Sequence, residues 1–138
     1  MRIYARNTVI TVTRNTVLAG LLLLTLTGCS TTNDNVTTQQ KIHIDQLEAL
    51  NPQGLYGPPD GLRSLSYEFC IPNEQRYIDK VKAIDPTVTM YSSPGRIGCQ
   101  KGKEFLCIGH TAQPNYRQVL NTLASQPYLK RIEETWFE

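Results

Sequence analysis

The sequence lacks the local motifs that mark the commonest catalytic sites. It contains no Gly-x-Ser-x-Gly, no His-Glu-x-x-His and no phosphate-binding loop motif. Histidine is scarce, since only His43 and His110 occur in 138 residues. A structural zinc site usually needs four close ligands, so the sequence predicts no metal site, and nothing in it indicates a cofactor or a catalytic residue.

Acidic residues are missing from the first 28 positions, and this changes the meaning of the net charge. The whole chain has 14 basic and 12 acidic residues. Three of the basic residues, Arg2, Arg6 and Arg14, precede Cys29, and every acidic residue follows it. From Cys29 onward the chain has 11 basic and 12 acidic residues. That balance gives no global positive field, so we expect no nucleic-acid partner.

A hydrophobic run long enough to cross a membrane is also missing. The apolar stretch at 17–26 has ten residues, whereas a membrane-spanning helix needs about 20. A short apolar run after an arginine-bearing, acid-free start is typical of an export signal. The run ends in Leu26-Thr27-Gly28-Cys29, which resembles the lipobox of bacterial lipoproteins, an aliphatic residue and two small residues before a cysteine.

The resemblance implies that residues 1–28 are a lipoprotein signal peptide and that Cys29 is lipidated. Its sulfur receives diacylglycerol, cleavage makes it the new N-terminus, and its amino group is acylated, with palmitate as the expected label. Each buried methylene adds roughly 0.8 kcal/mol to membrane binding. Ser30 follows the cysteine where an aspartate would otherwise stand, which resembles the sorting pattern of outer-membrane lipoproteins. We therefore expect a lipid-anchored protein of the bacterial cell envelope, on the outer membrane and facing the periplasm.

Residues 29–61 are expected to consist of the lipidated Cys29, a flexible tether and a turn-rich segment. The stretch 30–40 is polar and has no hydrophobic period, which is typical of a linker. A short helix is possible at 41–50, before the turn signals at 51–54 and 57–61. One domain is then predicted over 62–138, which gives a tether of about 30 residues.

Residues 62–138 alternate between the two-residue period of strands and the 3.6-residue period of helices. Strands are predicted at 65–71, 87–91, 103–108 and 128–137, and helices between Asn73 and Asp85 and between Pro114 and Gln126. The order β-α-β-β-α-β resembles the α+β ferredoxin-like fold, a four-stranded antiparallel sheet with two helices on one face. The main alternative is another small α+β arrangement in which the segment 41–61 adds an element.

Three cysteines remain once Cys29 is assigned to the lipid, and exported proteins form disulfides. In the predicted topology the end of the first strand and the loop after the second lie at one end of the sheet. We therefore favour a Cys70–Cys99 bridge, with Cys99–Cys107 as the alternative. A bridge closing a loop of about 30 residues stabilises by roughly 3–4 kcal/mol.

Cys107 is then left as a single thiol in an apolar strand. Its favoured interpretation is a small buried hydrophobic residue, with a reactive or intermolecular thiol as the alternative. Cys107 and His110 form Cys-x-x-His, but a strand points its first and fourth residues to opposite faces. This geometry disfavours both a metal site and a cysteine–histidine nucleophile.

The segment 92–103 is the most distinctive part of the predicted domain. It contains three glycines, the three basic residues Arg96, Lys101 and Lys103, and no acidic residue. Such a loop exposes backbone N–H groups and can hold an anion. These three cations form a candidate anion-binding patch, and the simpler interpretation is a solvated hairpin loop pinned by a disulfide.

Taken together, these features favour a non-enzymatic binding or assembly module on a lipid anchor. Its partners would be an envelope protein, lipopolysaccharide or peptidoglycan. The alternative function is a periplasmic thiol-redox or small hydrolytic enzyme that uses Cys107 or the basic loop 92–103.

Overall fold

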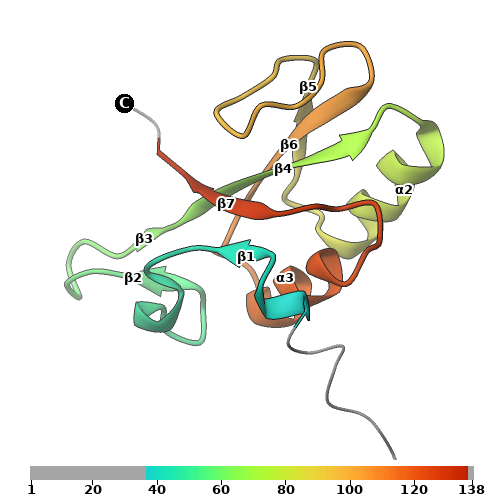
Figure 1. The fold of residues 1–138 in the computed structure, drawn as a ribbon. Coiled ribbons are helices and arrows are strands. Elements are labelled where there is room, and N and C mark those ends of the chain that lie inside the picture. The colour runs from blue at the N-terminus through green and yellow to red at the C-terminus, as the bar shows by residue number, and fades with distance from the viewer. Residues whose placement is uncertain (1–36, 137–138) are drawn as a thin grey trace, which may run out of the picture.

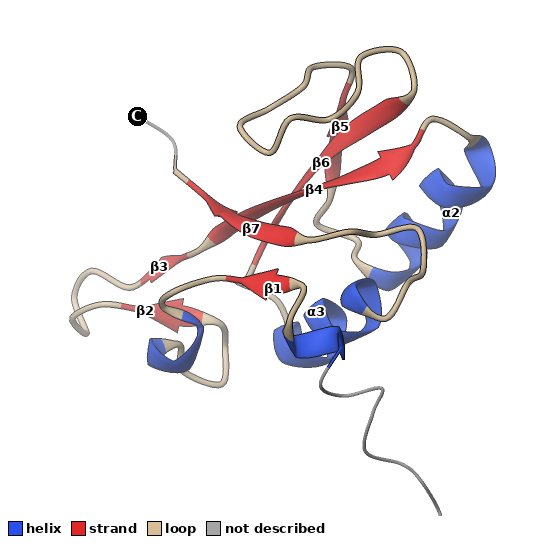
Figure 2. Cartoon of the chain, viewed as in Figure 1, coloured by secondary structure: helices blue, strands red, loops and turns tan. Residues whose placement is uncertain are grey.

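The computed structural model describes residues 37–136, which form an α+β domain (Figures 1 and 2). The predicted signal peptide at 1–28, the lipidated Cys29 and the tether residues 30–36 lie outside the described residues. The strands are β1 (Ile42–His43), β2 (Leu55–Tyr56), β3 (Arg63–Ser64), β4 (Ser66–Pro72), β5 (Thr89–Tyr91), β6 (Glu104–His110) and β7 (Ile132–Thr135). The helices are α2 (Gln75–Ile84), α3 (Tyr116–Ala124) and the 3-10 turn η1 (Leu47–Ala49).

The main sheet has five strands in the order β1-β7-β4-β6-β5, and β2 pairs separately with β3. Strands β7, β4, β6 and β5 are antiparallel to their neighbours, whereas β1 is parallel to β7. The predicted sheet of four antiparallel strands is therefore corrected to a mixed sheet of five. The reason is that the segment 41–61 supplies an edge strand, as the alternative arrangement allowed.

Strand β4 shows how the sequence period fixes the two faces of the sheet. Tyr67, Phe69 and Ile71 are fully buried on one face, under the helices. Glu68 and Cys70, which alternate with them, point to the other face. The alternation that predicted the strand therefore also predicted its apolar side.

The two faces of the sheet are covered in different ways. Helices α2 and α3 pack on one face and close the main core, in which Val81 and Leu120 are buried. The opposite face carries a smaller cluster of Ile97, Cys99 and Leu106, built mostly from the connection between β5 and β6. Figure 2 shows the helices gathered on one side of the sheet and this connection rising on the other.

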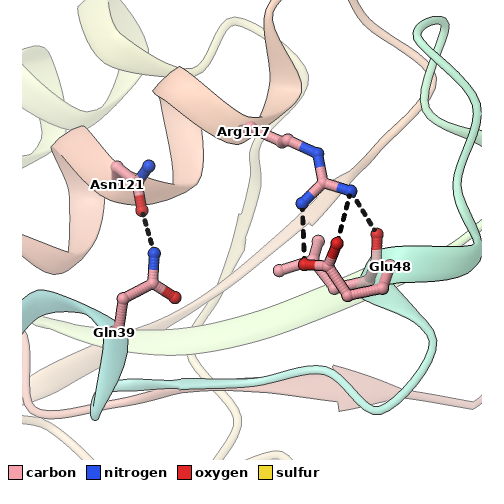
Figure 3. Close-up of polar contacts among 5 residues, drawn as sticks. Gln39, Glu48, Arg117 and Asn121 are labelled. Carbon is pink, nitrogen blue, oxygen red and sulfur yellow. Dashed lines mark hydrogen bonds and ion pairs between the residues drawn. The ribbon is translucent and has the colours of Figure 1, made fainter.

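The segment 41–61 packs against this core. Ile44 and Leu50 are each 7% exposed and belong to the main cluster. The Thr111 hydroxyl donates a hydrogen bond of 2.6 Å to the carbonyl oxygen of Gly54. Arg117 of α3 donates to the Leu47 carbonyl at 2.9 Å and to the Glu48 carboxylate at 3.0 Å (Figure 3). Residues 44–54 therefore pack against the core and against α3.

Within residues 37–136, none of the helices has the length and apolar character required to cross a bilayer.

Replacing Ile44 with alanine tests whether the segment 41–61 belongs to the domain. Because the Ile44 side chain is buried in the main cluster, the variant should lose about 2–4 kcal/mol of unfolding free energy. Urea denaturation followed by circular dichroism measures this loss. Leu62→Ala is the matched control, since Leu62 is 46% exposed and its truncation should cost less than about 0.5 kcal/mol. Equal stability of the two variants would contradict the packing of this segment.

Candidate functional site

The connection between β5 and β6, residues 92–103, is tied to the sheet by a disulfide bond. The sulfur atoms of Cys70 and Cys99 lie 2.07 Å apart, with their Cα atoms 5.5 Å apart. Cys70 lies on β4 opposite Leu106 of β6. Of the two pairings that the sequence left open, this is the favoured one. We call residues 92–103 the clamped loop.

Two charged side chains hold the clamped loop at Ile97. Glu68 is 3% exposed, and its Oε1 accepts a hydrogen bond of 2.8 Å from the Ile97 backbone N–H. Arg131 donates from Nη2 to the Ile97 carbonyl oxygen at 2.9 Å, and its Nε lies 2.8 Å from the Glu133 carboxylate. The backbone of Ile97 is therefore bound through both its N–H and its carbonyl group, next to the disulfide.

Gly95 lets the clamped loop approach the sheet closely. Its φ of +60° is in the left-handed region, and an added Cβ would lie 2.7 Å from the Leu106 side chain and 3.1 Å from Glu68 Oε2. A side chain there would meet both the apolar cluster and the buried carboxylate. The glycine is thus required by close packing as well as by backbone conformation.

The three predicted anion-binding residues, Arg96, Lys101 and Lys103, are all exposed on the clamped loop. The hollow beside the loop, of about 220 Å³, is lined by other residues. They are Cys70, Ile97, Gly98, Gln100, Glu104, Lys130 and Arg131. Lys130 and Arg131 are cations that the sequence reasoning missed. They directly precede β7, the neighbour of β4, and this strand order could have placed them near Cys70.

The surroundings of the clamped loop keep an excess of positive charge. Lys130 lies 3.5 Å from Glu104, and Arg131 pairs with Glu133. The cationic partner of each pair is the more exposed of the two. Anion binding by the loop stays a prediction.

Cys107 lies on the other face of β6 from the disulfide. It is fully buried in the main core and opposite Phe69 of β4. Burial, and to a lesser degree the charge of Asp85, raises the pKa of the Cys107 thiol to about 12. Neutral and enclosed, this thiol matches the favoured interpretation of a small buried hydrophobic residue.

A buried polar network surrounds Asp85, which follows α2. The Tyr67 hydroxyl donates a short hydrogen bond to Asp85 Oδ2, and Thr87 donates to Oδ1 from both its N–H and its hydroxyl. Gln113 Nε2 donates to Oδ1 at 3.1 Å. Burial, and then the charge of Asp85, raises the pKa of the Tyr67 phenol. Because each partner comes from a different part of the chain, the network joins α2, β4 and the start of α3.

Among residues 37–136, no three His, Cys, Asp or Glu side chains are grouped so that they could hold a metal ion. No family model matches the sequence, and no curated protein and no solved structure is significantly similar to it.

The environment of Cys107 predicts very slow alkylation in the folded protein. Because burial raises the pKa of the Cys107 thiol to about 12, its thiolate fraction at pH 8 should lie far below that of an exposed cysteine. Iodoacetamide labelling followed by mass spectrometry, with and without urea, measures this difference. Rapid labelling of the folded protein would favour the thiol-enzyme alternative.

The same thiol should contribute to alkaline destabilisation. The native thiol keeps its proton to higher pH than the unfolded thiol, so it has no effect below about pH 9. Stability should fall as the pH rises from about 9 toward 12. Urea melts of the wild type and Cys107→Ala across this range should show a smaller decline in the variant.

Proposed function

We propose that this protein is a bacterial lipoprotein whose domain serves as a non-enzymatic binding and assembly module. In this proposal Cys29 carries the lipid and the domain faces the periplasm from the outer membrane. The motif Leu26-Thr27-Gly28-Cys29 and the acid-free apolar segment before it support the anchor. Ser30 supports the outer-membrane assignment.

A ferredoxin-like core is part of the proposal. The antiparallel strands β7-β4-β6-β5, with α2 after β4 and α3 after β6, support it. Strand β1 would then be an addition at the β7 edge. Such domains have many functions, so the fold alone names none.

The held backbone of the clamped loop is the main support for the proposed binding function. Its backbone is held at Ile97 by Glu68 and Arg131 and at Cys99 by the disulfide, so little ordering remains to be done when a partner binds. Its cations suit a partner that bears phosphate or carboxylate groups, such as lipopolysaccharide, peptidoglycan or an acidic envelope protein. The burial of Cys107 counts against the thiol-enzyme alternative.

Replacing Cys29 with alanine tests whether this cysteine carries the lipid anchor. The variant has no sulfur to accept diacylglycerol, so it should lose palmitate labelling and keep its full precursor mass. Metabolic labelling and mass spectrometry measure these two results. Cys107→Ala removes a different cysteine and should keep the label. Palmitate on the Cys29→Ala chain would refute the anchor.

Removing two charges of the clamped loop tests the binding function. Arg96 has a contact of its own in the structure and is kept, and Lys101→Ala/Lys103→Ala is compared with Arg63→Ala/Lys82→Ala. Both variants remove two cations from exposed positions. Since an exposed ion pair contributes up to about 1 kcal/mol, recovery of crosslinked envelope partners should fall about fivefold or more in the first variant alone. Equal recovery from both would contradict a role for the loop.

A further inference from the structure

A second cluster of charged and aromatic side chains lies apart from the clamped loop, on the helical layer. It consists of Arg76, Tyr77 and Lys80 of α2 with Pro127 and Tyr128 of the connection to β7, and we call it the tyrosine patch. These five residues line a shallow hollow of about 520 Å³.

The tyrosine patch pairs two aromatic rings with two cations. The ring centroids of Tyr77 and Tyr128 lie 4.5 Å apart, with 53° between the ring planes. The Arg76 guanidinium lies 4.7 Å from the Tyr77 ring centroid, and the Lys80 ammonium lies 5.9 Å from that of Tyr128. The rings are half-buried while both cations are exposed.

Two acidic residues of α2, Glu74 and Asp79, lie close to the patch, so its positive charge is local to the Arg76 and Lys80 side chains that line the hollow. Glu74 pairs with Arg76 at 2.9 Å, but both side chains are more than half exposed, so the pair is weak. Asp79 accepts a hydrogen bond from Gln75 within the same helix. Tyrosine beside lysine and arginine is the combination that proteins place at the boundary of a membrane, with rings near the headgroups and cations on phosphates.

The chain coming from Cys29 enters the domain next to this patch. Gln39 donates a hydrogen bond of 3.3 Å to Asn121 of α3 (Figure 3), and Lys41 donates one of 3.1 Å to the Gln126 carbonyl. Gln126 directly precedes Pro127 and Tyr128 of the patch. The described chain therefore starts beside α3 on the helical layer (Figure 1), and Lys41 contacts the residue that precedes the patch.

The length of chain outside the described residues limits how far the patch can be from the bilayer. Seven residues separate Cys29 from Thr37, and a fully extended chain of that length spans about 30 Å at most. A lipid on Cys29 would therefore keep the patch at high effective concentration beside the membrane surface.

We propose that the tyrosine patch rests on the anionic headgroups of the bilayer that holds the lipidated Cys29. The inference depends on the proposed lipid anchor and adds an orientation to it. Arg76 and Lys80 bind headgroup phosphates and the Tyr77 ring lies at headgroup level, whereas the Tyr128 hydroxyl stays buried in the protein. The clamped loop covers the opposite face of the sheet. In this orientation the loop therefore points away from the membrane, where a partner can reach it. Each cation near an anionic surface raises membrane affinity about fivefold.

Lysine labelling of the full-length lipoprotein in vesicles tests this orientation. One set of vesicles contains phosphatidylcholine alone, and in the other phosphatidylglycerol replaces part of it. A water-soluble acetylating reagent and mass spectrometry give the labelling rate of each lysine. Lys80 should react several-fold more slowly on the anionic vesicles, and high salt should restore its rate. Lys82, on the same helix but outside the patch, and Lys101 and Lys103 of the clamped loop should react equally on both.

Charge reversal gives a matched pair of variants. Arg76→Glu should abolish the protection of Lys80, whereas Arg63→Glu, an equal change on β3, should keep it. If the protein binds both kinds of vesicle in a flotation assay but Lys80 reacts equally on both, the proposed orientation is wrong. The lipid anchor would still be supported by that result. Slow labelling of Lys101 and Lys103 instead would put the clamped loop on the membrane and also overturn the orientation. A protein that binds neither kind of vesicle in the flotation assay would refute the lipid anchor, and this inference would then fail with it.

Discussion

The structure depends on β4 being covered on both of its faces. The helices cover the side chains of Tyr67, Phe69 and Ile71 on one face. The clamped loop contacts Glu68 and Cys70 on the other. A small antiparallel sheet commonly leaves one face to water. Here twelve residues of loop replace a second layer, and the disulfide and the buried Glu68 carboxylate compensate for the small area that such a loop can bury.

This two-sided strand fixes the relative positions of the two surfaces proposed to act. The helical layer carries the tyrosine patch and receives the chain at Gln39, while the clamped loop lies across the sheet from both. The Asp85 network further couples α2 to β4 through Tyr67. A partner on the loop and a membrane on the patch would therefore be held apart by a rigid sheet rather than by a flexible linker.

The sequence predicted the parts of this arrangement that repeat over several turns or residues. The helix containing Val81 and the strand containing Phe69 each have four apolar positions in period, and both exist within two residues of their expected bounds. Strand β1 has only two residues, too few to show a period, and Ile44 gave no sign of its long-range contacts. The burial of Glu68 could not be predicted for a related reason, because a polar residue in an alternating strand is expected to be exposed. Its burial depends on a loop whose path only the tertiary structure gives.

The cysteines show how strand geometry separates reactive groups that are close in sequence. Leu106 and Cys107 are consecutive in β6, so their side chains point to opposite faces. The disulfide lies with Leu106 on the loop side, and Cys107 lies with Phe69 under the helices. Thiol exchange needs an accessible thiolate in line with the bridge, and the sheet itself stands between the two. The three cysteines of residues 37–136 are therefore compatible with a single stable pairing in the proposed periplasmic location. The orientation of the clamped loop then depends on a bond that the folded protein cannot rearrange from within.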